Sequence, residues 1–190
     1  MGSKSQVEPR SEETALEVPR RKVRIGVLSD THGWIDPNIQ EILASADCIV
    51  HAGDVLGASV LQTLEGLVGQ EQVVAVAGNN DIGGRASNGD DLPIVAEVRL
   101  PGGALVVTHG DQFGATPTHE RLREAWPEAR VIVYGHTHRL VCDQETLPWV
   151  LNPGAAGRTR VHDGPSCLML TIDGEGWTVE THQFKPSGGG

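Results

Sequence analysis

The sequence predicts an α/β fold of the α+β sandwich type, in which two mixed β-sheets pack face to face and helices flank them. Two patterns predict this fold class. In the first half of the chain, continuous apolar runs alternate with amphipathic stretches, which is typical of a mostly parallel sheet covered on both faces. In the second half, apolar runs follow one another through turn-rich connections, which is typical of antiparallel strands.

Three strands and two helices are expected in the first half. The strands are residues 23–29, 48–51 and 73–77, each a continuous apolar run. The two helices lie between them and carry apolar residues at helical spacing. The first begins near Pro37, because proline is tolerated in the first helical turn. The second covers residues 60–67.

The second half is richer in strands. A hairpin is expected from residues 94–100 and 104–108, followed by a helix at residues 117–126 that Thr116 caps. Residues 131–134 form another buried strand. The remaining strands are expected to form a meander with Asp-Gly turns at Asp163 and Asp173, and they are residues 149–151, 167–172 and 177–182.

One folded domain is expected at residues 22–186. Residues 1–21 are polar and lack periodicity, so they are predicted to be a disordered N-terminal tail, and residues 187–190 a flexible tail. The segment 82–91 is rich in Gly, Asn and Asp, and we expect a mobile loop that shapes access to a site. No repeat or internal linker divides the domain.

Composition limits the partners of the protein. The formal net charge is -10, and an acidic surface repels phosphate backbones, so a nucleic-acid partner is not expected. Cys48, Cys142 and Cys167 lie in apolar runs without metal-binding spacing, and we expect buried thiols in a reducing cytosol. No apolar run reaches the ~18 residues that cross a bilayer, and a signal-peptide core is absent. The sequence thus predicts a cytoplasmic protein without a membrane partner, and it is compatible with a homo-oligomer.

Candidate metal ligands follow five of the predicted strands. These residues are Asp30, His32, Asp54, Asn79, His109, His136 and His138. The first candidate ligand after each of these five strands recurs every 24 to 30 residues along the chain. A strand-helix-strand unit takes about 30 residues, so this spacing returns the chain to one sheet edge each time. In open α/β sheets, ligands bind beyond the carboxyl ends of the strands.

The donor types predict a centre with two metal ions. Carboxylate, imidazole and amide oxygens suit borderline-hard divalent cations, and seven donors are more than one such ion needs. A two-metal centre serves mainly phosphoryl chemistry. The pairs Asp30/His32 and His136/His138 are expected to project to one side of extended backbone. Glycines precede three of the ligands, where a missing side chain permits sharp turns, at Gly53, Gly78 and Gly135.

These motifs resemble those of the calcineurin-like metallophosphoesterase superfamily, and the short chain resembles its small single-domain microbial phosphodiesterases. The resemblance covers residues 30–138 and, more loosely, residues 152–154 with the sequence Asn-Pro-Gly. It implies a helix-flanked β-sandwich, as above. It also implies that metal one is held by Asp30, His32, Asp54 and His138, and metal two by Asp54, Asn79, His109 and His136. Asp54 would bridge the two ions. Through the resemblance alone manganese is favoured, while the donor chemistry also admits Fe, Co, Ni or Zn.

The predicted function is hydrolysis of a small phosphate diester by a metal-bridging hydroxide. The resemblance implies catalytic parts for Asp54, His109 and Asn80. Asn80 stands where many superfamily members have His, and an amide donates a hydrogen bond but cannot deliver a proton. Asp81 is expected to orient its neighbours. Asn80 and Arg158 are candidate substrate contacts, since arginine clasps phosphate bidentately, although the pattern fits a surface arginine equally well.

Two other functions stay open from the sequence. One is a nuclease acting on DNA ends, like the DNA-repair branch of the superfamily, which the acidic composition disfavours. The other is a non-catalytic, protein-binding scaffold, because the retromer scaffold subunit resembles this fold; the complete ligand set favours catalysis instead. Among single residues, His51 is expected to be a buried structural histidine. Trp34 and Asp36 either border the site or pack its loop.

Overall fold

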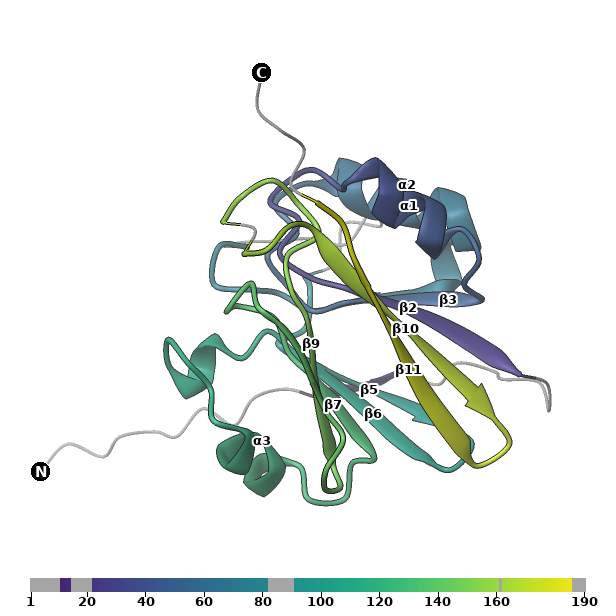
Figure 1. Cartoon of the computed structure of the whole chain (residues 1–190), viewed down its shortest axis with the longest axis vertical. Helices are drawn as coiled ribbons and strands as arrows, with labels where there is room; N and C mark the ends of the chain where they lie inside the picture. Colours follow the sequence, from purple (N-terminus) through teal and green to yellow (C-terminus); the bar gives the residue numbers. More distant parts are fainter. Residues whose placement is uncertain (1–10, 15–21, 82–90, 161, 186–190) are drawn as a thin grey trace, which may run out of the picture.

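Two mixed β-sheets pack face to face in the computed structural model of the chain (Figure 1), which describes residues 11–14, 22–81, 91–160 and 162–185. Within these residues, one sheet has five strands in the order β11-β10-β2-β3-β4. The other has six strands in the order β1-β5-β6-β7-β9-β8. The structure confirms the fold class predicted from the sequence.

The five-stranded sheet is parallel in its centre and antiparallel at one side. Strand β2 pairs in parallel with β3, and β3 with β4, whereas β10 runs antiparallel to both β2 and β11. The carboxyl ends of the three parallel strands therefore meet at one edge of the sheet. The strands are β2 (Val23–Leu28), β3 (Cys48–His51), β4 (Val73–Ala75), β10 (Ser166–Asp173) and β11 (Gly176–Gln183).

The six-stranded sheet has a similar plan. Strands β6, β7 and β9 are parallel neighbours, β5 runs antiparallel to β6, and β8 runs antiparallel to β9. The carboxyl ends of β6 and β7 thus also meet at one edge. The strands are β1 (Ser11–Thr14), β5 (Val95–Leu100), β6 (Gly103–Thr108), β7 (Val131–Val133), β8 (Leu140–Asp143) and β9 (Trp149–Pro153).

Apolar side chains from both sheets meet between the layers and form the main core. Burial is almost continuous along β2, β3 and β10, as expected for strands covered on both faces. A fully buried Leu, Ile or Val contributes about 1.5–3 kcal/mol relative to an exposed one. The core between the sheets includes Ile25, Val27, Val50, Leu105, Val107, Val131, Val133, Leu151, Leu168 and Leu170.

Helices α1 (Pro37–Leu43) and α2 (Ala58–Val68) cover the outer face of the five-stranded sheet (Figure 1). Helix α1 begins at the predicted proline. The Asp36 side chain caps it by accepting a hydrogen bond of 2.9 Å from the Asn38 backbone amide. Apolar residues of both helices pack on this sheet and form a second buried cluster with it. The cluster includes Leu28, Ile39, Ile49, Leu61 and Leu64.

Helix α3 (His119–Ala125) packs on the outer face of the six-stranded sheet through Leu122. It is shorter than predicted, and its cap is Thr118 rather than Thr116. Thr118 has extended backbone, and its side chain accepts a hydrogen bond of 3.4 Å from the Arg121 backbone amide, as an N-cap residue does. The described residues also form two short 3₁₀ helices, η1 (Gln70–Gln72) and η2 (Asp111–Phe113).

The sequence missed one strand of the second half, and several expectations for this half were wrong. Strand β8 was not predicted as a separate strand. Strands β9 and β10 do not form one meander, because they lie in different sheets. The turn at Asp173 does connect β10 and β11 as expected, whereas Asp163 lies in the loop between the two sheets. Cys142 is exposed, while Cys48 and Cys167 are buried, and burial raises the pKa of each of these two thiols to about 12.

The predicted tails and the loop of residues 82–91 are described only in part. Residues 11–14 form β1, which pairs in parallel with β5, so these four residues depart from the predicted disordered tail. Residues 1–10, 15–21, 82–90 and 186–190 lie outside the described residues. None of the helices in the described ranges is long and apolar enough to cross a membrane.

Candidate metal centre

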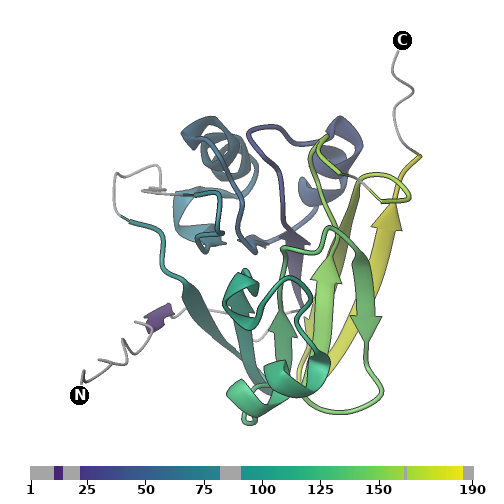
Figure 2. The same ribbon diagram turned by 90° about the vertical axis from the view of Figure 1, so that its left-hand side faces the viewer.

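The seven candidate ligands lie on loops that follow five of the strands. Loops of the two sheets approach one another on the side of the sandwich that faces the viewer in Figure 2. Strands β2, β3 and β4 belong to one sheet, and β6 and β7 to the other, so both sheets contribute. The ligands follow these strands in chain order: Asp30 and His32 after β2, Asp54 after β3, Asn79 after β4, His109 after β6, and His136 and His138 after β7.

Five of the seven residues have left-handed backbone. The φ angles are 54° for Asp30, 46° for His32, 55° for Asp54, 66° for His136 and 57° for His138. The expectation of extended backbone at the two i, i+2 pairs was therefore wrong. A non-glycine residue in this region costs about 1–3 kcal/mol, and such strain gathers at functional sites. Sharp turns, rather than straight strand ends, bring these side chains together.

The first ligand group consists of Asp30, His32, Asp54 and His138. One donor atom from each of the four residues lies within 4.8 Å of the others. His138 Nε2 is 3.1 Å from Asp30 Oδ1 and 3.4 Å from His32 Nε2, and His32 Nε2 is 3.7 Å from Asp54 Oδ2. Both carboxylates are almost completely buried. Four donors this close can hold one divalent ion.

The orientation of His138 shows why this group fits a cation. Its Nδ1 lies 2.9 Å from the Thr159 carbonyl oxygen, which can only accept, so Nδ1 donates there. In a neutral ring Nε2 then presents a lone pair to Asp30 Oδ1, and two acceptors face each other. Asp30 Oδ1 is buried and accepts no hydrogen bond from any described residue. A shared cation, either a proton or a metal ion, relieves this repulsion.

The second ligand group consists of Asp54, Asn79, His109 and His136. Asn79 Oδ1 lies 3.2 Å from His109 Nε2 and 3.0 Å from His136 Nδ1, and His109 Nε2 lies 3.6 Å from Asp54 Oδ1. His109 Nδ1 donates to the Ala52 carbonyl oxygen at 2.8 Å, so its Nε2 presents a lone pair to these oxygens. This group repeats the pattern of converging acceptors.

Asp54 belongs to both groups. Its Oδ2 faces His32 of the first group and its Oδ1 faces His109 of the second. The backbone amide of Asn80 donates to Oδ1 at 2.9 Å, and the Asn80 side-chain amide donates to Oδ2 at 2.6 Å. A side chain at residue 78 would collide with this carboxylate, which explains Gly78. The geometry is that of a shared carboxylate held from one side by Asn80.

The surroundings set the charges of the site. Burial lowers the pKa of His32 and of His136, so both rings favour the neutral form that binds metal. Burial raises the pKa of Asp30, but a protonated His138 ring 3.1 Å away would outweigh it, and the pKa of Asp30 is held below its ordinary value. Burial lowers the pKa of His138, and Asp30 outweighs it in turn, so the pKa is raised.

Asp81 orients the loop after β3, as expected. Its carboxylate accepts from three backbone amides, those of Val55 at 3.1 Å, Leu56 at 2.8 Å and Gly78 at 2.9 Å. His51 is completely buried and contacts Thr31 Oγ1 at 2.9 Å, and burial lowers its pKa to about 4. This environment agrees with a structural histidine.

Three contributors to the site were missed from the sequence. Ser29 Oγ donates to Asp30 Oδ2 at 2.7 Å, and Thr159 supplies the carbonyl oxygen that orients His138. The Arg160 guanidinium lies 3.2 Å from His138 Nε2. A lone Ser and an exposed Arg carry no signal in a single sequence. The Asn-Pro-Gly turn could have indicated that the segment after it crosses the site.

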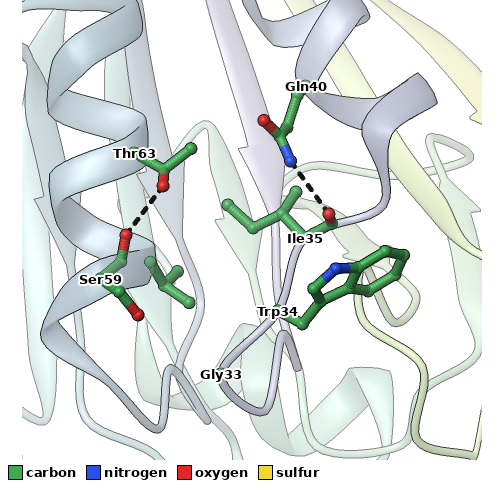
Figure 3. A pocket seen from close by; sticks show the side chains of 7 residues that line it. Gly33, Trp34, Ile35, Gln40, Ser59 and Thr63 are labelled. Carbon is green, nitrogen blue, oxygen red and sulfur yellow. Dashed lines mark hydrogen bonds between the residues drawn. The ribbon is translucent and has the colours of Figure 1, made fainter.

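The other residues singled out near the site lie at its rim. The Arg158 guanidinium stacks on the Trp34 ring at 3.8 Å from the ring centroid, and Arg158 is exposed. Trp34 also lines a pocket of about 120 Å³ between α1 and α2, where Ser59 and Thr63 face Gln40 (Figure 3). None of the seven candidate ligands lines this pocket. Asp36 caps α1 and therefore packs the loop.

Sequence comparisons identify relatives of this chain. Residues 23–175 match the calcineurin-like phosphoesterase superfamily domain. A probable metallophosphoesterase of Methanothermobacter thermautotrophicus is 31% identical over 158 residues, which cover 80% of this chain and 87% of the relative. A phosphodiesterase of Methanocaldococcus jannaschii is 30% identical over 142 residues, which cover 70% of this chain and 83% of the relative.

Solved structures show the same fold. Vacuolar protein sorting 29 of Cryptosporidium parvum has a TM-score of 0.72 at 18% identity, covering 87% of this chain and 99% of that one. A predicted phosphoesterase of Streptococcus pneumoniae has a TM-score of 0.65 at 25% identity, covering 85% and 90%. The extent of the sequence match and the two acceptor-rich ligand groups agree: the chain belongs to the calcineurin-like phosphoesterase superfamily, a metal-dependent family.

Proposed function

We propose that the protein is a phosphodiesterase that hydrolyses small phosphate diesters with the help of two divalent metal ions. The observation that carries the proposal is the position of Asp54, whose two oxygens face the two ligand groups. The phosphodiesterase relative in Methanocaldococcus jannaschii supports the choice of reaction. Family resemblance favours manganese, and the nitrogen and oxygen donors also suit Fe, Co, Ni or Zn.

Each ligand group is proposed to hold one ion. When bound, paired dications polarise phosphoryl oxygens and lower the pKa of a water molecule. His109 and His138 keep their outward nitrogens aimed at the site, because Ala52 and Thr159 fix the other ring nitrogen. No side chain of the site is needed as a covalent nucleophile in this scheme.

Asn80 is proposed to hold Asp54 and to contact the substrate. One amide hydrogen of its side chain is used on Asp54 Oδ2, so the second can reach a substrate oxygen. An amide cannot protonate a departing alkoxide. We therefore expect nitrophenyl esters, which leave without a proton, to react far faster than alkyl esters of the same phosphate. Equal rates on the two ester types would contradict this proposed role of Asn80.

The test of the function starts from protein purified without added metal. Elemental analysis is followed by turnover of bis-nitrophenyl and mono-nitrophenyl phosphate with Mn, Fe, Co, Ni and Zn in turn. The proposal expects metal-dependent hydrolysis, faster on the diester. A protein that binds these ions and hydrolyses neither ester with any of them contradicts the proposal.

Two alternatives have their own tests. A nuclease would degrade single-stranded DNA under the conditions that cleave the small diester, and the net charge of -10 disfavours this. A non-catalytic scaffold would share the fold, as vacuolar protein sorting 29 does at 18% identity. A scaffold has no need for seven converging donor groups, which favours the enzyme.

A further inference from the structure

The segment 152–160 is tied to two of the ligand loops. The Asn152 side-chain amide donates to the Gly135 carbonyl oxygen at 2.7 Å, in the loop after β7. The Ala156 backbone amide donates to the Ser29 carbonyl oxygen at 2.9 Å, in the loop after β2. These bonds fix the path of the segment across the site.

Arg160, at the end of this segment, contacts the atom that His138 offers to the first ligand group. Its guanidinium lies 3.2 Å from His138 Nε2, while His138 Nδ1 donates to the carbonyl oxygen of neighbouring Thr159. Arg160 has left-handed backbone with a φ angle of 48°, so the chain turns at this residue, at the rim of the site. The guanidinium thus lies next to the donors of the first group.

Among the described residues, no side chain neutralises the charge of Arg160. No carboxylate of the described residues forms an ion pair with it, and the Asp30 carboxylate is buried and faces His138. A cation beside a group that holds a divalent ion is repelled unless an anion lies between them. A guanidinium matches the geometry of a phosphate with two parallel N–H donors.

We propose that Arg160 binds a non-ester oxygen of the phosphoryl group that the metal centre holds, and is the arginine that positions the substrate. The inference rests on the proposed function, since it takes the ligand groups to bind metal. Arg158 stacks on Trp34 and contacts none of the candidate ligands, so it lies further out than Arg160. The substrate therefore needs a phosphoryl group with at least one free anionic oxygen on the side of Arg160.

The experiment measures binding rather than turnover, by calorimetric titration of Mn²⁺ and then of inorganic phosphate into the metal-loaded protein. The variants are Arg160→Ala, Arg160→Lys and the control Arg139→Ala, which removes an exposed arginine next to His138 in sequence. We expect Arg160→Ala to bind phosphate at least about 10-fold more weakly, since a charged hydrogen bond is lost. Arg160→Lys should fall between wild type and Arg160→Ala, because it keeps the charge without the fork.

The affinity for Mn²⁺ distinguishes a substrate-binding role of Arg160 from a merely structural role. Removing a positive charge beside His138 should leave Mn²⁺ affinity unchanged or raise it, while phosphate affinity falls. Weakened binding of both Mn²⁺ and phosphate in Arg160→Ala would overturn the inference in favour of a structural part. Unchanged phosphate affinity, or an equal loss in Arg139→Ala, would overturn it as well. Failure of the wild type to bind Mn²⁺ would instead overturn the proposed function.

Discussion

Asp54 connects the two halves of the site, because each of its oxygens faces a different histidine. Its burial makes this arrangement costly without cations, since a buried charge must be paired. Asn80 donates two hydrogen bonds to the Asp54 carboxylate, one to each oxygen. Each of these oxygens also faces a histidine, His109 or His32. Asp54 thus belongs to both ligand groups.

This shared position predicts different metal losses in two variants. Asp54→Asn should lose most of both ions, whereas Asn79→Ala should lose mainly the second ion and retain about one per chain. Both variants should lose at least about 100-fold in diester turnover. Elemental analysis of protein loaded with manganese gives the stoichiometry, and Asp163→Asn, which changes an exposed carboxylate, serves as the control. Equal metal loss in the two site variants would contradict a bridging Asp54.

At the level of single residues, the sequence predicted which side chains lie close together, but it did not predict their backbone conformation. The seven donors stood out because each follows an apolar run. Nothing in the sequence indicated left-handed backbone at Asp30 or His136, since non-glycine residues rarely adopt it. Arg160 was missed for a related reason, because its contact with His138 depends on the course of the loop after β9, 22 residues further along the chain.

Among the secondary-structure elements, α3 is fixed to β8 by a cluster of charged side chains. Asp143 Oδ2 on β8 lies 2.6 Å from His119 Nδ1 and 2.8 Å from an Arg123 guanidinium nitrogen, both on α3. Burial raises the pKa of Asp143, but the hydrogen bonds from Arg123 and His119 outweigh it, so the pKa is lowered. The ionised carboxylate therefore stabilises the fold.

The cluster makes a pH-dependent contribution to stability. A lowered folded pKa means that the contribution is complete above the unfolded value of about 3.9 and is lost as pH falls through the folded pKa. Asp143→Asn should reduce the free energy of unfolding by about 1 kcal/mol at pH 7, and by less at pH 3. Urea unfolding at both pH values measures this, with Glu145→Gln as an exposed control on the same turn. A deficit that is the same at both pH values would contradict the cluster as its source.

Local sequence patterns predicted where helices and strands lie, but they did not predict which strands belong to the same sheet. The apolar runs placed β2, β3, β4, β6 and β7 correctly within a few residues. The assignment of β9 and β10 to different sheets was missed, because both read as buried strands and the choice of sheet depends on long-range packing. The cap of α3 was misplaced by two residues, because Thr116 and Thr118 are both residues of a cap-forming type and the local sequence does not choose between them.

For the whole molecule, the spacing of the motifs was the most informative feature of the sequence. Because the motifs recur every 24 to 30 residues, the loops that carry the candidate ligands were expected to meet at one edge of a sheet. The structure adds that two sheets share this edge, so that β2, β3 and β4 face β6 and β7 across the site. Packing of both sheets on one core fixes the distance between the two ligand groups.

A crystal structure of the protein grown with manganese, with anomalous data collected near the manganese edge, would locate the ions directly. A bridging Asp54 predicts two anomalous peaks about 3.5–4 Å apart. Asp54 should lie between the peaks, and the other six donors should divide into the two ligand groups. A single peak, or two peaks that do not share Asp54, would contradict this arrangement.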